Sequence, residues 1–212
     1  MITVHKFTVN PLQENSYLLH DETGQCLIVD AGFHSPEEKE QIAAFITHHK
    51  LLPVALVNTH CHFDHLLGVP FLKRRYEIPF YCHRDDAFWL PLAMLQGSYF
   101  GVYLTEMSQA DRFLEEHEDI LFGNSLLKVI HVPGHSPGHL VFHSPEEQFV
   151  MAGDVLFKGS IGRTDLEGGS YSSLINHIHS KLLVLPGETV VYSGHGPETT
   201  IGAEKSGNPF LQ

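Results

Sequence analysis

The chain has 212 residues, of which 42% are hydrophobic and 18% are charged. This length and composition are typical of a globular protein and predict a single domain over residues 1–212. The formal net charge of −12 argues against nucleic acid or an anionic membrane as the main partner, because both require basic surfaces. The sequence gives no indication of the oligomeric state.

The amino terminus, MITVHKFTVNP, has no basic stretch followed by a long apolar run, so we expect no signal peptide. No apolar run in the chain is long enough to span a bilayer. The three cysteines, Cys26, Cys61 and Cys82, form no Cys-x-x-Cys pair. Together these features predict a protein of the reducing cytoplasm.

Short segments rich in β-branched and aromatic residues begin the chain, and they predict strands over residues 2–9, 16–20 and 25–30. A helix is expected from Ser35 to about residue 49, because Ser35 can cap it, Pro36 suits the first turn and Glu38 completes a capping box. The pattern then predicts a buried strand over 53–58, a helix from about 64 to 76, a strand over 78–82 and a helix over 84–95.

The second half of the chain repeats this succession of strands and helices. Residues 97–113 have no clear period and are interpreted as an irregular insertion or lid. Further strands are expected over 126–132, 139–143, 148–152 and 189–193, and a helix over 170–184. Strands followed by alternating strands and helices favour the α/β class, with two sheets packed face to face and helices outside, a four-layer αββα sandwich.

The stretch THCHFDH follows the predicted buried strand at 53–58 and places His60, His62, Asp64 and His65 in one loop. Imidazole and carboxylate groups are the ligands that hold zinc or non-haem iron. Alternate residues of an extended loop point the same way, so His60 and His62 can converge on one metal ion. Asp64 and His65, at the turn into a helix, can face a second ion, while Cys61 is expected to point away.

Three later loops supply the ligands that this cluster lacks. His135 in VPGHSPGH, Asp154 in MAGDVLF and His195 in YSGHGP each follow a predicted strand. Shared between two metal ions, these seven ligands leave each ion an open position for a water that both can bind, as in a catalytic site. The expected sets are His60, His62 and His135 for one ion and Asp64, His65 and His195 for the other, with Asp154 bridging them.

The other histidines are expected at the surface or in packing contacts. They are His5, His20, His34, His48, His49, His83, His117, His131, His143, His177 and His179. For His139 two interpretations stay open, either a supporting contact near His135 or a packing residue.

The order THCHFDH, PGHSPGH, GD and GHG resembles the ligand series of the metallo-β-lactamase superfamily over essentially the whole chain. GDVLFKGSIGRTDLEGG and the terminal GHGPETTIGAEKSGNPF are similar to the short bacterial relatives of glyoxalase II, the hydroxyacylglutathione hydrolases. The superfamily hosts thioester, lactam, lactone and phosphodiester hydrolysis as well as redox chemistry, so the resemblance fixes the substrate less closely than the fold.

The resemblance implies a hydrolase with two metal ions, usually zinc, with iron or manganese tolerated. Its small-molecule substrate would be a thioester such as S-lactoylglutathione, cleaved to lactate and glutathione. The metal pair would lower the pKa of a bridging water to roughly 7, and the hydroxide would attack the thioester carbonyl while a metal stabilises the oxyanion. Asp64 would orient the water and Asp154 would bridge the ions, which makes both of them catalytic candidates.

Two departures from glyoxalase II concern substrate binding. Its carboxy-terminal helical domain supplies basic residues to glutathione, and this chain ends soon after His195, so we expect that part of the site to be absent. The lysine and tyrosine that hold glutathione in the family correspond to Arg163 and Asp165. Arg163 either meets a substrate carboxylate or forms an ion pair with Asp165. Lys158 and Lys205 are weaker candidates for the same anion.

Aromatic residues of the central segment have two open interpretations, as pocket walls or as ordinary core. They are Phe88, Trp89, Phe100 and Tyr103.

The main competing function is that of the persulfide dioxygenases, which share the fold and the GRTD motif. They bind one iron through the equivalents of His60, His135 and Asp154, leave His62 out, and oxidise glutathione persulfide. The terminal GAEKSGNPF favours the hydrolase. A third interpretation, a metal-braced binding domain without catalysis, is disfavoured by the open coordination positions.

Overall fold

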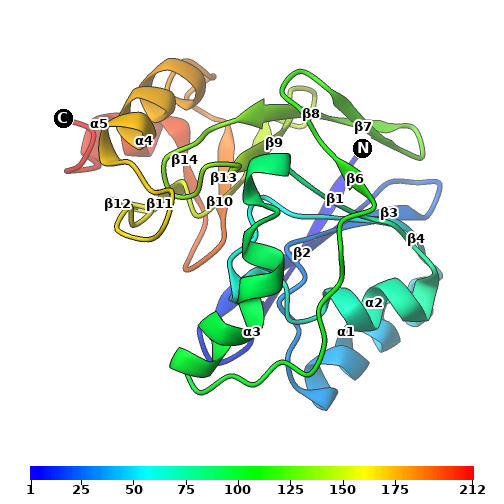
Figure 1. The fold of residues 1–212 in the computed structure, drawn as a ribbon. Helices are drawn as coiled ribbons and strands as arrows, with labels where there is room; N and C mark the ends of the chain where they lie inside the picture. Colours follow the sequence, from blue (N-terminus) through cyan, green and yellow to red (C-terminus); the bar gives the residue numbers. More distant parts are fainter.

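Two six-stranded sheets face each other at the centre of the computed structural model, which describes residues 1–212 (Figure 1). The first sheet has the order β1-β2-β3-β4-β5-β6 and the second the order β14-β13-β10-β9-β8-β7. The strands of the first sheet are β1 (Thr3–Val9), β2 (Glu14–His20), β3 (Gln25–Val29), β4 (Leu52–Val57), β5 (Phe80–Cys82) and β6 (Arg112–Phe113). Those of the second are β7 (Asp119–Phe122), β8 (Ser125–His131), β9 (Leu140–Ser144), β10 (Phe149–Gly153), β13 (Val190–Ser193) and β14 (Thr199–Thr200).

Alternation along the strands builds two cores at once. In β3, Cys26 and Ile28 belong to the cluster between the first sheet and its helices, whereas Leu27 and Val29 belong to the cluster between the two sheets. All four side chains are buried. Successive side chains of a strand point to opposite faces, so a strand that is apolar at every position must be covered on both sides.

Helices cover the outer face of each sheet, which makes the four-layer αββα sandwich expected from the sequence (Figure 1). On the first sheet lie α1 (Pro36–His48), α2 (Val69–Tyr76) and α3 (Trp89–Tyr99). On the second lie α4 (Tyr171–His177), continued by a π turn (Ile178–Leu182), and α5 (Ile201–Gly207). None of these helices has the length and apolar character needed to cross a membrane.

Strand direction gathers the loops at one edge of the sandwich. β3, β4 and β5 are parallel neighbours, so their carboxyl ends lie together. In the second sheet β10 pairs in parallel with β13, and β9 is antiparallel to both β8 and β10, so β8, β10 and β13 end at one edge too. Loops at strand ends are where layered folds place their functional side chains.

Two expected helices are wrong in their limits. The helix expected from about residue 64 begins only at Val69, because residues Phe63–His65 form a 3-10 turn and Pro70 occupies the first turn of α2. The helix expected over 84–95 is split into a 3-10 turn (Arg84–Asp86) and α3, which continues to Tyr99. Gly97 allows this continuation, since a Cβ there would lie 2.6 Å from the carbonyl oxygen of Val102.

The short elements escaped the sequence analysis. These are β6, β7, β14, α5 and the two-stranded sheet of β11 (Leu156–Phe157) and β12 (Ser160–Ile161). The strands of two residues, β6, β11, β12 and β14, carry no readable alternation, so only their pairing partners define them. β7 and α5, with four and seven residues, are too short for a clear period.

Asp21 joins the two sheets and gives the first testable prediction. Its carboxylate accepts hydrogen bonds from the backbone of Thr23 (2.9 Å) and Asn124 (2.7 Å) and from the hydroxyl of Ser125 (2.9 Å). Burial alone raises the pKa of Asp21, but these hydrogen bonds outweigh it and lower the pKa to about 2. The stabilisation that the charged Asp21 carboxylate gives the folded state is therefore complete above its unfolded pKa near 4. It is lost as pH falls toward 2.

We expect Asp21→Asn to lower the free energy of unfolding by about 1–2 kcal/mol at pH 6, because an amide group would face backbone donors. The deficit should shrink at pH 3, where the wild-type carboxyl is losing its charge. Urea unfolding at both pH values measures this deficit. The control is Glu146→Gln, at an exposed carboxylate outside this network. An equal deficit at both pH values would contradict the assignment.

Candidate metal centre

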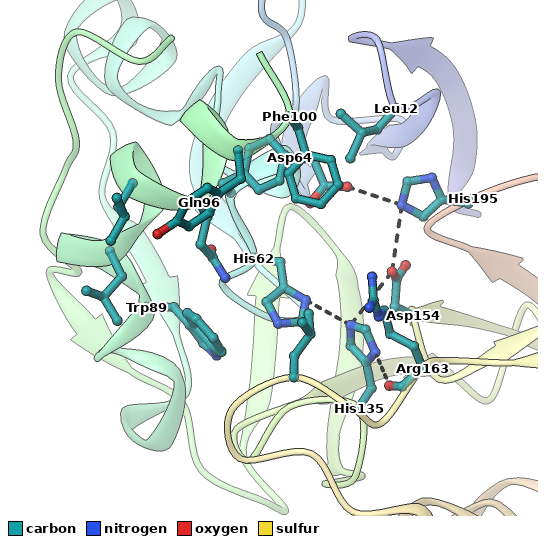
Figure 2. Close-up of a pocket in the computed structure, with 15 residues that line it drawn as sticks. Leu12, His62, Asp64, Trp89, Gln96, Phe100, His135, Asp154, Arg163 and His195 are labelled. Atoms are coloured by element: carbon teal, nitrogen blue, oxygen red, sulfur yellow. Dashed lines mark hydrogen bonds and ion pairs between the residues drawn. The ribbon is translucent and has the colours of Figure 1, made fainter. Parts of the chain in front are cut away.

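Three buried imidazoles converge at the carboxyl edge of the sandwich. Nε2 of His135 lies 2.9 Å from Nδ1 of His62 (Figure 2). The same Nε2 lies 3.3 Å from Nε2 of His60. The three side chains come from the loops after β4 and β8 and are at most 6% exposed. The structure thus brings together the set that the sequence assigned to one ion.

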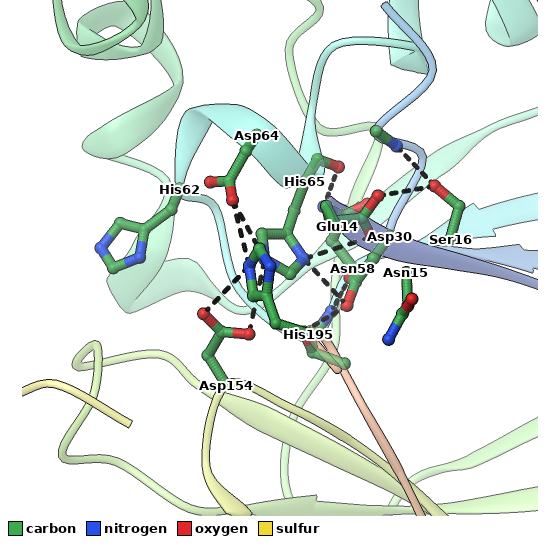
Figure 3. Close-up of polar contacts among 12 residues, drawn as sticks. Glu14, Asn15, Ser16, Asp30, Asn58, His62, Asp64, His65, Asp154 and His195 are labelled. Atoms are coloured by element: carbon green, nitrogen blue, oxygen red, sulfur yellow. Dashed lines mark hydrogen bonds and ion pairs between the residues drawn. The ribbon is translucent and has the colours of Figure 1, made fainter. Parts of the chain in front are cut away.

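The second expected set lies beside the first. Nε2 of His195 is 3.3 Å from Oδ2 of Asp64, and Nε2 of His65 is 3.8 Å from the same oxygen (Figure 3). Asp154 lies between the sets, with one carboxylate oxygen 3.6 Å from His65 and the other 3.7 Å from both His135 and His195. Within each set the donor atoms lie within 4.8 Å of one another, close enough to share one metal ion.

Two glycines allow these close approaches. Gly153 adopts φ +50°, and a Cβ there would lie 2.3 Å from Oγ1 of Thr59. A Cβ on Gly194 would lie 2.2 Å from Oδ1 of Asp154. Only residues without a side chain permit the β10 and β13 ends to come this near to the cluster.

The two sets differ in electrostatic character. Burial, followed by the neighbouring imidazoles, lowers the pKa of His60 and His62 well below the usual value. For His65 burial opposes protonation, yet the carboxylates of Asp64 and Asp154 raise its pKa well above the usual value. Burial alone would raise the pKa of Asp64, but His65 and His195 hold it well below its usual range.

These features fit bound cations. Three neutral imidazoles that turn nitrogen atoms toward one point repel each other unless a cation or proton lies among them. Buried atoms that face the cluster without a hydrogen-bond partner include Nε2 of His65 and Oδ1 of Asp154. Buried polar atoms are normally partnered, and a ligated ion would satisfy these. The donor set of imidazole and carboxylate suits zinc, iron or manganese.

Hydrogen bonds behind the cluster hold the rings in position. Nδ1 of His135 donates to the carbonyl oxygen of Arg163 at 2.8 Å, which leaves Nε2 with its lone pair toward the cluster. Nδ1 of His60 lies 3.1 Å from Oγ1 of Thr59, which in turn donates to Asp30 at 2.6 Å. The backbone N–H of Thr59 donates to the same carboxylate at 2.7 Å.

His139 supports the site rather than packing at a distance from it. Its ring stacks on that of His60, with centroids 4.8 Å apart, and its Nε2 accepts a hydrogen bond of 3.1 Å from the backbone of Asp154. It is fully buried. This resolves the two interpretations that the sequence left open.

Sequence reasoning missed three buried carboxylates. Asp30 lies 3.2 Å and Glu14 3.6 Å from Nδ1 of His65 (Figure 3). Asp86 accepts hydrogen bonds from the backbone of Cys61 (2.9 Å) and Gly138 (2.6 Å) and from Ser136 Oγ (2.8 Å). Asp30 follows an apolar strand directly, as Asp154 does, and that signal was available. For Glu14 and Asp86 only the fold reveals burial.

A cavity of about 510 Å³ opens beside the cluster. Its walls include Trp89 and Phe100 from the aromatic candidates, and Arg163 from the basic ones (Figure 2). Phe88 and Tyr103 are 36% and 76% exposed and lie outside its lining, so they are neither core nor wall.

Of the three basic candidates, only Arg163 reaches this cavity. Its guanidinium also forms a two-pronged ion pair with Asp165, at 2.7 and 2.8 Å. Lys158 is exposed and does not line the cavity, and Lys205 donates to the carbonyl oxygen of Leu183 at 3.2 Å. Of the basic side chains expected to meet a substrate carboxylate, the cavity therefore contains only Arg163, and Asp165 already pairs with it.

A further group, His83, Asp85 and His131, has donor atoms near one another. The rings of His83 and His131 stack almost in parallel, 12° apart with centroids at 4.3 Å. A metal ion lies near the plane of each imidazole that binds it, and two stacked rings share no such point. Nδ1 of His83 also accepts from the backbone of Asp85 at 3.1 Å. These residues pack, as the sequence analysis expected for both histidines.

The chain belongs to the metallo-β-lactamase superfamily, whose family model matches residues 9–195. It is 40% identical over 208 residues to a probable metallo-hydrolase of Bacillus subtilis, covering 97% of this chain and 96% of that one. It is 35% identical over 205 residues to a hydroxyacylglutathione hydrolase of Haemophilus influenzae, covering 96% and 95%. This membership supports a metal-dependent hydrolase.

Solved structures agree with the fold. A protein described as TTHA1623 in a di-iron-bound form has a TM-score of 0.88 and 40% identity, covering 98% of this chain and 100% of that one. A protein described as the BLEG-1 B3 metallo-β-lactamase also has a TM-score of 0.88, with 36% identity and coverage of 99% and 100%.

Proposed function

We propose that this chain is a two-metal thioester hydrolase of the glyoxalase II type, with S-lactoylglutathione as the first substrate to test. The observation that carries the proposal is the pair of donor sets around Asp154, each with room on the cavity side. The similarity to a hydroxyacylglutathione hydrolase supports the substrate class. We further propose zinc as the metal, because imidazole and carboxylate are ligands that bind it. We propose the cytoplasm as the location, because the three cysteines are free.

Seven side chains would hold the two ions. Each triad turns imidazole nitrogen or carboxylate oxygen toward its own centre, and Asp154 lies within 3.7 Å of members of both triads. Two bound cations would supply Lewis acidity and a water of near-neutral pKa. The ligands are His60, His62 and His135 for one ion and Asp64, His65 and His195 for the other, with Asp154 shared.

The protein's own groups have defined tasks in hydrolysis. Asp64 keeps its charge at neutral pH, because His65 and His195 outweigh the effect of burial on its pKa. Its carboxylate lines the cavity and can accept a hydrogen bond from the attacking water. The carbonyl oxygen of Arg163 and the stacked ring of His139 fix the imidazoles, so little reorganisation accompanies the reaction.

The competing mono-iron dioxygenase would leave His62 outside the metal site. Nδ1 of His62 lies 2.9 Å from Nε2 of His135, whereas Nε2 of His60 lies 3.3 Å from the same atom. This geometry favours the hydrolase.

The proposal is tested by release of free thiol from S-lactoylglutathione, with oxygen uptake on glutathione persulfide measured in parallel. A chromogenic cephalosporin should be included, because one structural relative is described as a β-lactamase. We expect thioester cleavage without oxygen uptake. Persulfide oxidation, or lactam cleavage without thioester cleavage, would overturn the proposal.

Arg163 gives a prediction on substrate binding. Its guanidinium lines the cavity while paired with Asp165, so a substrate carboxylate would have to share it. We expect Arg163→Ala to raise KM about three- to tenfold with kcat nearly unchanged, because the substrate would lose one charged contact at an exposed side chain. Asp165→Asn, which frees the guanidinium, should lower KM. Steady-state kinetics on both variants decide, and an unchanged KM in Arg163→Ala would remove this side chain from substrate binding.

A further inference from the structure

Helix α3 is apolar on two faces, and the protein core explains only one of them. Leu90, Ala93 and Gly97 are buried against the first core cluster or its neighbours. Leu92 and Leu95, on a different face, line the cavity beside the metal centre while staying 39% and 53% exposed. Single exposed leucines need no explanation, but apolar side chains gathered around a cavity indicate a ligand surface.

Trp89, Tyr99 and Phe100 extend this surface along the helix, and we name the five residues 89, 92, 95, 99 and 100 the α3 wall. Tyr99 and Phe100 are 76% and 57% exposed. Across the cavity lie the side chains of the metal centre and Arg163 (Figure 2). The cavity therefore has one polar end, where bonds would be cleaved, and one long apolar side.

The dimensions and charges of this cavity disagree with a small polar acyl group. Its volume of about 510 Å³ lies in the range of sites that enclose drug-sized ligands, so a three-carbon hydroxyacyl group would fill only a small part of it. Gln96 is the one polar residue that α3 contributes to the lining, and Arg163 is already paired with Asp165. The hydrogen-bonding groups on this side are the Gln96 amide, the Trp89 indole N–H and the Tyr99 hydroxyl, and none of them carries a charge. Nothing along α3 would therefore compensate the desolvation of a charged acyl group.

We propose that the α3 wall is an acyl-binding surface and that the preferred substrates are thioesters of apolar acyl groups, medium-chain or aromatic. The inference rests on the proposed thioesterase function and narrows its substrate class. The thioester carbonyl lies at the metal centre, and the apolar acyl group lies along Leu92, Leu95 and Phe100. Binding removes from water apolar surface that the free protein leaves exposed.

The first test compares kcat/KM for glutathione thioesters that differ only in the acyl group: lactoyl, acetyl, butyryl and hexanoyl. Burial of one methylene gives up to about a fourfold gain, so the values should rise from acetyl to hexanoyl and exceed that for lactoyl. Equal or falling values would overturn the inference while leaving thioester hydrolysis established.

Two substitutions on the same helix sharpen the test. Leu95→Gln should reduce the hexanoyl-to-acetyl ratio of kcat/KM at least about threefold, because it replaces part of the wall with an amide. Met94→Gln is the matched control, since Met94 is 45% exposed on α3 but does not line the cavity. A ratio that falls equally in both variants, or in neither, would contradict the assignment.

A binding measurement separates this inference from the proposed function. Trp89 is the only tryptophan of the chain and lies in the wall, so its fluorescence reports occupancy. The probes are S-methyl-, S-butyl- and S-hexylglutathione, which cannot be hydrolysed. Kd should fall at least about tenfold from the methyl to the hexyl compound, whether or not any thioester is cleaved. Equal Kd values would overturn the acyl surface, whereas steep binding without hydrolysis would overturn only the thioesterase.

Discussion

His60→Ala is expected to abolish hydrolysis, with kcat/KM reduced more than about a thousandfold. The ring lies among His62, His135 and His139, and its Nε2 is one of three nitrogens turned toward a common point. Its loss leaves an incomplete donor set, so the metal content per chain should fall with the activity. Metal analysis and thiol release on the same preparation measure both effects.

The matched control for this variant is His179→Ala, at an exposed histidine far along the chain in the π turn. It should retain metal and activity. Circular dichroism and urea unfolding establish that His60→Ala is folded, because the sandwich core does not include this side chain. A folded His60→Ala protein that hydrolyses thioesters at the wild-type rate would refute the assignment of this site.

Asp86→Asn is the second substitution with a large expected effect. This buried carboxylate accepts hydrogen bonds from Cys61, Ser136 and Gly138, and so ties the loop after β4 to the loop after β8. Burial raises its pKa to about 6 despite those donors. An amide would turn N–H groups toward backbone donors that have no alternative partner.

We expect Asp86→Asn to lower the free energy of unfolding by about 2–3 kcal/mol and to weaken metal binding about ten- to a hundredfold. Asp85→Asn, at the adjacent exposed carboxylate, should do neither. Urea unfolding and competition with a chelator give the two quantities. Unchanged metal affinity in a destabilised Asp86→Asn protein would show that Asp86 braces the fold without positioning the ligands.

The layers, and the convergence of the seven candidate ligands, could be predicted from the sequence, since both depend on local patterns. Runs of apolar residues, such as residues 26–29 in β3 and 54–57 in β4, must be covered on both faces. Histidine or aspartate shortly after predicted strands led to His60, His135 and Asp154 as candidates. Strand ends gather at one edge for topological reasons, so residues distant in sequence were correctly expected to meet.

The parts that escaped prediction depend on tertiary contacts. Glu14 and Asp86 are buried only because distant loops close over them, and no pattern around QENSY or RDDAF signals it. The end of α3 was misplaced because Gly97 reads as a helix breaker, whereas here it permits close packing against Val102. Which aromatic residues line the cavity likewise depends on how α3 is oriented over the metal cluster. Because α3 is apolar on two faces, its sequence does not show which face points into the cavity.

Metal stoichiometry tests the central claim most directly. The chain should be purified without added metal or chelator, and its zinc, iron and manganese quantified against the protein concentration. The two donor sets around Asp154 predict two ions per chain, zinc foremost, and proportional loss of thioester hydrolysis as they are removed. A single iron per chain, with full activity, would contradict a two-metal hydrolase.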